Sequence, residues 1–474
     1  MPRSIFAFPS LFTATLLMLL GSGLLTTYLA LRMAAEGAAG QAGWLMAAHY
    51  AGLVLGGKFG HLMISRVGHV RAYVAAGGMV SAAVIAHGLL PWLAAWLPLR
   101  FLIGLGMMTQ FMVVESWLNE QAEPRKRGRV FSMYMTASYL GLVLGQLVLV
   151  VRPALGLEPL LLVALCFSLC LVPVATTRRI HPAPLKPAPL EPRFFLKRVP
   201  QSMTTVAMAG LAIGAFYGLG PVYAGAQGLE TREVGLFMTT CVLAGLVVQA
   251  PLGRLSDRFD RSLLIRLIAV ALALSVLPLG LLPRPPLALM LAVGFVVSLL
   301  LFALYPLAVA LSNDHVEQER RVALSAMLLL VFGVGACLGP LIAGELMSRG
   351  VPRLLYLFIG ACALVLVWRV RPQDVHGLHR VEEAPIQHVA VPVAMAGSPL
   401  SVALDPRVDE AVVQEQMQGG AAGAGSPPEQ EDATDVDTAA VDTAAVDTAA
   451  GDAATGESAG KGDDGMSTQR EAAS

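Results

Sequence analysis

Residues 234–283 read VGLFMTTCVLAGLVVQAPLGRLSDRFDRSLLIRLIAVALALSVLPLGLLP, in which two apolar runs flank a short charged segment. Each run is about as long as the roughly 20 residues that a helix needs to cross the ~30 Å hydrocarbon layer of a bilayer. Lipid offers no partners to backbone polar groups, so a segment that spans it must be a helix. This stretch therefore predicts two transmembrane helices joined by a charged turn at the membrane surface.

The rest of the chain repeats this pattern. The protein has 474 residues, of which 55% are hydrophobic and 14% charged, with a mean hydropathy of +0.65. Soluble domains usually carry about 25% charged residues, so lipid must be the solvent for much of this chain. We predict twelve spans, at residues 10–31, 43–64, 72–92, 98–118, 130–151, 158–175, 202–224, 234–252, 263–283, 286–311, 323–346 and 353–370.

Basic residues indicate the orientation of these spans. If the N-terminus is cytoplasmic, 22 Lys and Arg residues fall on the cytoplasmic side and seven on the other side. Such a bias is typical of cytoplasmic loops. The first apolar run exceeds the ~7–15 residues of a signal peptide core, so we interpret it as a span. We expect a multi-pass protein of a bacterial inner membrane with both termini in the cytoplasm.

Four regions follow from the composition. Residues 1–175 and 202–371 each hold six predicted spans, and the Pro-rich, basic segment 176–201 between them reads as a cytoplasmic linker. Residues 372–474 are acidic and contain three tandem copies of VDTAA. Such a low-complexity segment cannot bury enough apolar surface to fold, so we expect a disordered tail.

The two six-span halves resemble each other. Ala51-Gly52-Leu53-Val54 recurs 193 residues later as Ala244-Gly245-Leu246-Val247. At an offset of 194, Asn119 matches Asn313, and Gly141 and Gly145 match Gly335 and Gly339. Repeated halves are typical of secondary transporters, in which the substrate site lies between the repeats near the middle of the bilayer.

The charged segment after the eighth span carries a family resemblance. Residues 253–261, GRLSDRFDR, resemble the loop motif G-x-L-x-D-R-x-G-R of the major facilitator superfamily, with Asp260 where glycine is usual. A degenerate copy follows the second span, in which Ser65 replaces the aspartate. The resemblance covers about residues 5–372, and residues 113–129 are similar to the YcaD-like branch. It implies an all-α fold of twelve helices in two pseudo-symmetric bundles.

In this family the loop motif is associated with gating. Asp257 can cap a helix terminus and pair with nearby arginines, and such pairs latch one bundle against another as the halves rock. The alternative is a basic loop that only sets topology. The candidate gating residues are Gly253, Asp257, Arg258 and Arg261 in the second half and Arg66, Gly68 and Arg71 in the first.

Glu115 is the clearest ionisable residue inside a span. Such groups are costly in lipid and mark ion or substrate pathways. Proton coupling and binding of a cationic substrate are two functions that this carboxyl supports. A structural role, as a partner for Arg66 or Arg127, is equally open.

Six further polar residues are pathway candidates. Arg100, near the outer end of the fourth span, can bind an anionic group or a helix carbonyl. His49 can titrate near neutral pH or serve as a structural histidine. In this superfamily the first, fourth, seventh and tenth helices line the pathway, which favours Gln110, Tyr217 and Tyr305. Gln249 of the eighth span completes the set.

The predicted function is secondary active transport of a small solute by alternating access, coupled to a proton gradient. The alternative is a membrane sensor or scaffold on the same fold that signals through its acidic tail. The sequence has no Walker A motif and no catalytic constellation, so we expect no enzymatic activity. We expect no cofactor, no metal and no nucleic-acid partner. The expected partners of a monomer are the lipid bilayer, the solute and protons.

Overall fold

The computed structural model describes residues 7–90, 92–122, 127–176, 191–317, 320–371 and 398. This part of the chain is built from α-helices, with no strand among the residues described. The helices are α1 (Ala7–Ala35), α2 (Ala42–Val67), α3 (His69–Leu89), α4 (Leu93–Gln121), α5 (Arg127–Val151), α6 (Glu158–Leu169), α7 (Leu171–Ala175), α8 (Pro192–Arg198), α9 (Pro200–Ala226), α10 (Thr231–Arg258), α11 (Arg261–Ser275), α12 (Leu277–Leu281), α13 (Leu287–Asn313), α14 (Arg321–Ser348) and α15 (Leu354–Arg369), with a 3-10 turn η1 (Ala39–Gln41).

The helices confirm the predicted spans. Within the described ranges, ten segments are long and apolar enough to cross a membrane, and α2 and the shorter α15 bring the total to twelve. Two spans are each split into a pair of helices, α6 with α7 and α11 with α12. Pro173 and Pro278 lie just after these breaks. Proline has no N–H to donate and its ring clashes with the preceding turn, which explains both interruptions.

The outer faces of the helices are apolar. Leu161, Leu165 and Leu169 are each about half exposed and follow one another at a spacing of four residues along α6. Leu267 and Leu274 form a similar exposed row on α11. A continuous apolar surface of this kind is unfavourable in water. The chain is therefore a multi-pass membrane protein whose outer surface is solvated by lipid.

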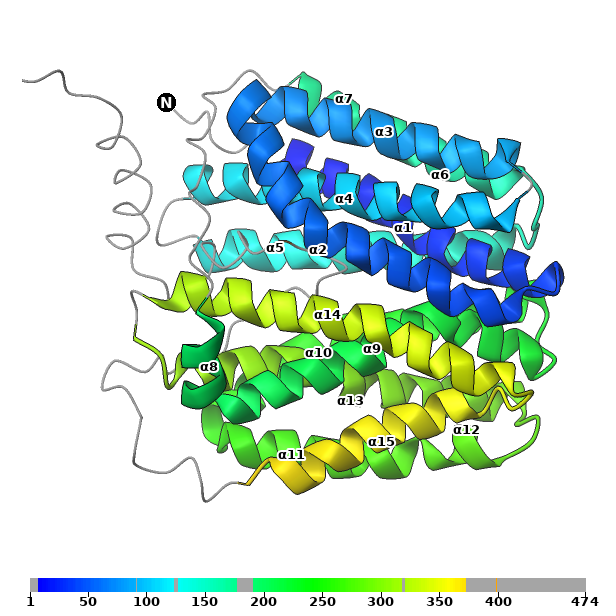
Figure 1. Cartoon of the computed structure of the whole chain (residues 1–474), viewed down its shortest axis with the longest axis vertical. Coiled ribbons are helices and arrows are strands. Elements are labelled where there is room, and N and C mark those ends of the chain that lie inside the picture. The colour runs from blue at the N-terminus through cyan, green and yellow to red at the C-terminus, as the bar shows by residue number, and fades with distance from the viewer. Residues whose placement is uncertain are drawn as a thin grey trace, which may run out of the picture. The chain divides into compact units, whose positions relative to one another are not determined.

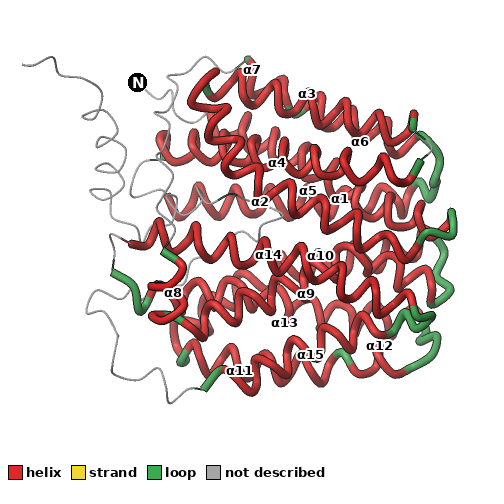
Figure 2. The backbone as a smooth tube through the Cα atoms, in the orientation of Figure 1, coloured by secondary structure: helices red, strands yellow, loops and turns green. Residues whose placement is uncertain are grey.

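The first six spans and the last six lie as two groups with roughly parallel axes (Figure 1). In the first group α4 packs on α2 and α3, and α5 packs on α1. In the second, α14 packs on α9 and α13 packs on α10. The groups meet where α2 contacts α14 and where α5 contacts α10. Loops lie at the two ends of the helices (Figure 2).

Glycines from the internal repeat make equivalent helix contacts in both groups. A Cβ at Gly141 or Gly145 of α5 would overlap backbone carbonyls of α1, and one at Gly335 or Gly339 of α14 would overlap carbonyls of α9. Small residues let membrane helices approach this closely. The sequence repeat is therefore a structural repeat, in which α5 pairs with α1 as α14 pairs with α9.

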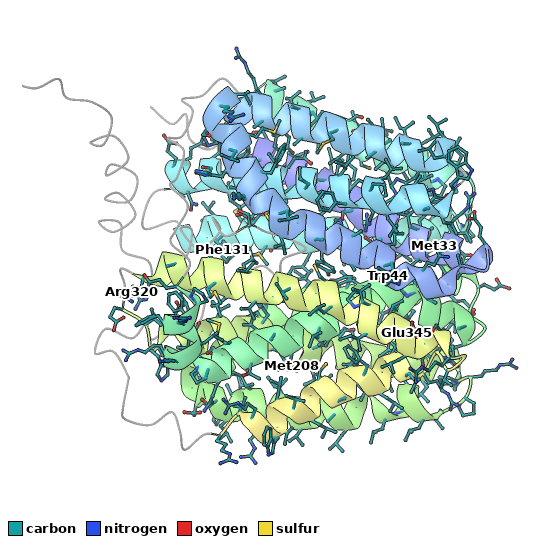
Figure 3. All side chains as sticks on the ribbon, in the orientation of Figure 1. Met33, Trp44, Phe131, Met208, Arg320 and Glu345 are labelled. Carbon is teal, nitrogen blue, oxygen red and sulfur yellow. The ribbon has the colours of Figure 1, made fainter. Side chains whose placement is uncertain are left out.

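The two ends of the helices differ in charge. We call the end that holds the α2–α3 turn and α8 the basic end, because Arg66, Arg71 and Arg258 are exposed there. Arg320 also lies at the basic end, whereas Met33, Trp44 and Glu345 lie at the other, which we call the opposite end (Figure 3).

Part of the predicted linker forms the short helix α8, which the sequence did not predict. Arg198 of α8 forms a 3.1 Å ion pair with Glu317. Arg320 pairs with Glu191 at 2.9 Å, and its guanidinium lies 4.3 Å from the ring centre of Phe194. These contacts hold α8 against the turn between α13 and α14. Residues 177–190 of the linker lie outside the described part of the chain, as does the predicted disordered tail, residues 372–474, apart from Ser398.

Candidate transport site

Arg100 is buried in α4 with 1% of its surface exposed. Its Nη2 donates a 2.6 Å hydrogen bond to Oγ1 of Thr26 on α1. Its Nη1 has no hydrogen-bond partner, and none of the ion pairs found among the described residues involves this side chain. The guanidinium therefore keeps one nitrogen available for a further acceptor.

α2 brings two aromatic side chains close to Arg100. His49 and Tyr50 both interact electrostatically with the guanidinium. Both are buried, and neither Nδ1 of His49 nor the hydroxyl of Tyr50 has a hydrogen-bond partner. α2, which carries both residues, also contacts α14 and α9 of the second half. It is therefore the helix through which the polar groups around Arg100 meet the second half.

Tyr217 and Tyr305 belong to an aromatic cluster of the second half. The ring of Tyr217 stacks on Phe302 of α13 with centroids 5.7 Å apart. Tyr305 meets Phe332 of α14 edge to face at 5.0 Å. Offset and edge-to-face pairs of this kind are favourable beyond their buried area. These flat apolar surfaces lie on α9, α13 and α14, of which α9 and α14 contact α2.

Gln249 links the two halves directly. Its Nε2 donates to the hydroxyl of Tyr139 on α5 at 3.4 Å and to the Gly245 carbonyl at 3.3 Å, while its Oε1 has no partner. Sequence reasoning missed Tyr139 and Tyr50, because the orientation of an uncharged side chain around a helix cannot be read from one sequence.

The structure does not bring Gln110 to this group. Its Nε2 lies 3.5 Å from Sγ of Cys170, at the break between α6 and α7. A Cβ at Gly77 of α3 would also contact its amide nitrogen. Gln110 thus points into the packing between α3, α4 and α6, away from the second half.

Glu115 lies apart from Arg100, about 22 Å further along α4 and about 9 Å before its end at the basic end, at 1.5 Å per residue. The carboxylate is fully buried. Its Oε1 accepts hydrogen bonds of 2.8 Å from the Tyr134 hydroxyl of α5 and of 2.8 Å from the Ser398 backbone N–H. The Ser398 hydroxyl donates to Oε2. Ser398 is itself buried, so this residue of the predicted tail packs against the bundle.

The loop motif of the second half forms a buried ion pair. Arg261, at the start of α11, pairs with Asp314 just after α13 and donates to the Ala310 carbonyl at 3.2 Å. The cap of α11 is Asp260, whose carboxylate accepts from the Leu263 N–H at 2.8 Å. Gly253 and Arg258 lie in the last turns of α10, Arg258 exposed. The side chain of Asp257 lies outside the described part, so its predicted role stays a prediction.

The first-half copy of the motif has a glycine at the turn between α2 and α3. Gly68 separates α2 from α3 with φ +83°, a left-handed conformation that glycine adopts without strain. Arg66 and Arg71 on either side are exposed. His69 is instead the buried residue of this turn, with Nε2 3.3 Å from the Ser116 hydroxyl of α4. His69 therefore occupies the place in this half that Arg261 occupies in the other.

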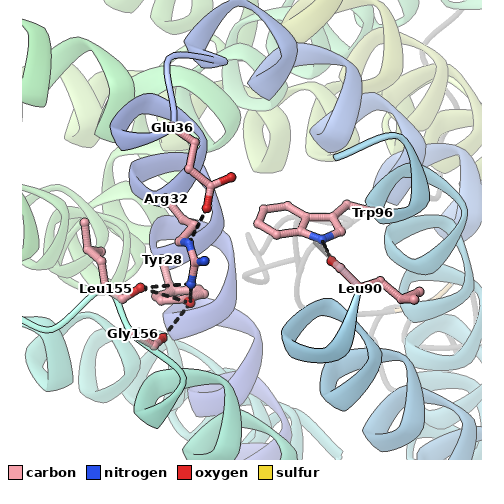
Figure 4. A network of polar contacts seen from close by, with 7 residues as sticks. All are labelled: Tyr28, Arg32, Glu36, Leu90, Trp96, Leu155 and Gly156. Carbon is pink, nitrogen blue, oxygen red and sulfur yellow. Dashed lines mark hydrogen bonds and ion pairs between the residues drawn. The ribbon is translucent and has the colours of Figure 1, made fainter. Parts of the chain in front are cut away.

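A separate polar network joins α1 to the α5–α6 loop at the opposite end (Figure 4). The Tyr28 hydroxyl donates to the Gly156 carbonyl at 2.7 Å and accepts from Arg32 at 3.1 Å. Arg32 also pairs with Glu36 at 2.6 Å. Trp96 donates to the Leu90 carbonyl at 3.0 Å across the α3–α4 turn. These bonds are local to helix ends, so we assign this network to structure.

The cysteines form no disulfide. All five are free, and four of them are buried. Across the ranges that the structure describes, no three His, Cys, Asp or Glu side chains gather in a way that could hold a metal ion. The chemistry of the candidate site therefore comes from Arg100, Glu115 and the tyrosines.

Comparison with known proteins identifies the family. A sequence profile of the Major Facilitator Superfamily matches residues 11–298 and 228–408. The chain belongs to this family of membrane transporters. It is 30% identical over 327 residues to "Uncharacterized MFS-type transporter Ent638_1421" of Enterobacter sp. (strain 638), covering 69% of this chain and 84% of that protein. It is 29% identical, with the same coverage, to "Uncharacterized MFS-type transporter YcaD" of Salmonella enteritidis PT4. The resemblance to the YcaD-like branch is confirmed.

Solved structures show the same fold. The nucleoside transporter NupG aligns with a TM-score of 0.66 at 12% identity, over 78% of this chain and 99% of that one. A D-xylose-proton symporter aligns with a TM-score of 0.64 at 16% identity, over 79% of this chain and all of that one. The predicted major facilitator fold is therefore confirmed.

Proposed function

We propose that this protein is a proton-coupled secondary transporter that carries a small solute by alternating access. The observation that carries the proposal is the buried carboxylate of Glu115, which accepts a hydrogen bond from Tyr134 on the neighbouring helix. A carboxyl group in a span can hold a proton in one access state and release it in the other. The alignment with a D-xylose-proton symporter adds support from a structural relative.

Contacts between the halves support alternating access. At the opposite end, Gly43 of α2 packs against Pro340 and Gly344 of α14, and Met46 packs against Gly218 of α9. These helices belong to different halves, which we propose are the domains 1–175 and 202–371. Rocking of one half against the other would separate this contact and admit solute from that side.

We further propose that the basic end faces the cytoplasm of a bacterial inner membrane. The excess of arginine at that end supports this orientation. With the basic end in the cytoplasm, the loop motifs, α8 and both termini would lie on the cytoplasmic side. The relatives and solved structures reported above are all named as transporters, so they lend no support to the sensor hypothesis.

The proposal is tested by uptake into proteoliposomes. A thermal-shift screen of the purified protein first finds a solute that binds, because binding to the folded state raises apparent stability. Uptake of that solute is then measured with an imposed pH gradient. We expect Glu115→Gln to abolish accumulation against a gradient while leaving the protein folded, because glutamine cannot release a proton.

Glu120→Gln is the matched control, because Glu120 lies five residues further along α4 and is exposed. We expect this variant to transport like the wild type. Accumulation at the wild-type level by Glu115→Gln would remove Glu115 from the coupling mechanism.

A further inference from the structure

Arg100 is a buried cation that has no counter-ion among the residues described. Its side chain is 1% exposed, and its one hydrogen-bond partner is the neutral hydroxyl of Thr26. An isolated buried charge is costly unless it is paired. A guanidinium buried in this way therefore calls for an anion that binds there for part of the working cycle.

Several unsatisfied polar atoms surround the guanidinium. They are Nη1 of Arg100 itself, the Tyr50 hydroxyl, Nδ1 of His49 and Nε2 of His87. All belong to buried side chains, and Tyr50, His49 and His87 interact electrostatically with Arg100. Buried polar groups normally have partners, so unpaired polar atoms gathered at one place indicate a binding site, in which Nη1 of Arg100 and the Tyr50 hydroxyl are the donors.

The donors suit a carboxylate. A guanidinium is planar and its N–H groups match the two oxygens of a carboxylate, and a hydroxyl can donate a further bond. Apolar rings lie in the second half across the α2–α9 contact, where Tyr217 of α9 stacks on Phe302 at 5.7 Å. The site therefore offers a charged end and an apolar end.

The charge of the site limits the charge of the ligand. At the repeat offset of 194 residues, the counterpart of Arg100 is Gly294. The other buried arginines among the described residues, Arg261 and Arg321, lie at the first residues of α11 and α14, at the basic end. One cation is thus present to neutralise one negative charge.

We propose that Arg100 and Tyr50 bind the carboxylate of an amphipathic monoanion, whose apolar body lies against Tyr217 and Phe302. This inference rests on the proposed function, since it names the class of solute that the transporter carries. Glu115 lies about 22 Å away along α4, so the proposed anion site and the proposed proton site are separate groups.

The test compares carboxylates with their neutral amides. Full-length protein in an uncharged detergent is titrated with phenylacetate, hexanoate and acetate, with phenylacetamide and hexanamide, and with the dianion phthalate. Binding is followed by thermal shift and calorimetry. We expect phenylacetate and hexanoate to bind, and their amides, acetate and phthalate to bind at least about tenfold more weakly, because charge-assisted bonds and apolar contact are both needed.

Substitutions at Arg100 complete the test. Arg100→Gln should weaken phenylacetate binding roughly ten- to a hundredfold, and Arg100→Lys, which keeps the charge without the planar fork, should weaken it less. Arg152→Gln, at an exposed arginine of the same end, should leave binding unchanged. If Arg100→Gln fails to fold, the phenylacetate affinity of Arg100→Lys is compared with that of the wild type, and a weaker affinity in the variant supports the site.

Three outcomes would overturn the inference: equal binding of an amide and its carboxylate, wild-type affinity in the folded Arg100 variants, or no binding of any carboxylate in the panel. Uptake assays separate this result from the proposed function. Transport of a neutral or cationic solute would reject the anion site and keep the transporter. A carboxylate that binds at Arg100 but is never carried across the membrane would reject the transporter and keep the site.

Discussion

At the scale of single residues, the pairing of Tyr134 with Glu115 has the most direct functional consequence. The two residues are fully buried, and the hydroxyl of one lies 2.8 Å from the carboxylate of the other. A hydrogen bond to a charged group is worth about 1.5–3 kcal/mol. Tyr134 therefore stabilises one protonation state of Glu115 relative to the other.

Removal of this hydroxyl should disturb coupling without unfolding the protein. We expect Tyr134→Phe to slow proton-linked uptake several-fold and to shift its pH dependence, because Glu115 loses a donor while the ring stays in place. Uptake in proteoliposomes over a range of external pH measures the effect. Tyr28→Phe, in the structural network at the opposite end, is the control and should keep the wild-type pH profile. Identical profiles for Tyr134→Phe and the wild type would contradict this role.

The sequence predicted some residues of the candidate site, and the structure added others. Arg100 and Glu115 stand out because charges are rare in spans. Gln110 has a similar signal but points into helix packing, beside Cys170. The direction in which a side chain points depends on the rotation of its helix, and an almost uniformly apolar helix does not reveal that rotation. For the same reason, the structure was needed to identify Tyr50, Tyr139 and Tyr134.

At the scale of elements, the contact between α2 and α14 controls the opposite end. A Cβ at Gly43 would overlap the backbone carbonyl of Pro340, which cannot move without shifting α14. Gly57 lies on the same helix, and a Cβ there would meet nothing within 4 Å. The two glycines therefore offer a matched pair of substitutions.

Gly43→Ala should separate the two helices at this end. We expect it to destabilise the closed arrangement by about 1–3 kcal/mol, the usual cost of overpacking. Its melting temperature should fall, and a cysteine placed at Ser348 should react faster with a water-soluble maleimide. Gly57→Ala should do neither, because it adds a methyl group in open space. Equal labelling rates in both variants would show that this contact does not close the opposite end.

Element boundaries were predictable because the apolar runs are long and end at charged or proline-rich turns. The predicted span 286–311 became α13, Leu287–Asn313, and 202–224 became α9, Pro200–Ala226. The short helix α8 was missed, because its seven residues lie in a proline-rich segment and depend on ion pairs with Glu317 and Arg320. Contacts formed between distant segments leave no local pattern in the sequence.

At the scale of the whole molecule, the internal repeat sets the architecture, and its departures from symmetry set the function. Arg261 and His69 occupy equivalent turns, yet Arg261 forms an ion pair with Asp314, whereas His69 lies 3.3 Å from the Ser116 hydroxyl. Arg100 has Gly294 as its counterpart. The charged groups that could bind solute and proton thus lie in the first half, and the second half supplies aromatic surface.

The tail provides a test of transport against signalling. We expect a protein that lacks residues 385–474 to keep transport, because the twelve spans end at Arg369. Loss of Ser398 removes two hydrogen bonds to Glu115, so the rate of proton-linked uptake should change by a few-fold. Uptake by the truncated protein, with Ser398→Ala in the full chain as its control, measures both effects. Complete loss of uptake by a folded truncated protein would favour the sensor hypothesis.

Distances between spin labels on the two halves test alternating access most directly. In a variant without native cysteines, one label pair replaces the exposed residues Arg152 and Arg232 at the opposite end, and another replaces Arg71 and Arg266 at the basic end. Double electron–electron resonance in liposomes at two pH values, with and without solute, gives both distances. We expect one distance to lengthen as the other shortens. Two distances that stay fixed, or that change in the same direction, would contradict a transporter that works by rocking its halves.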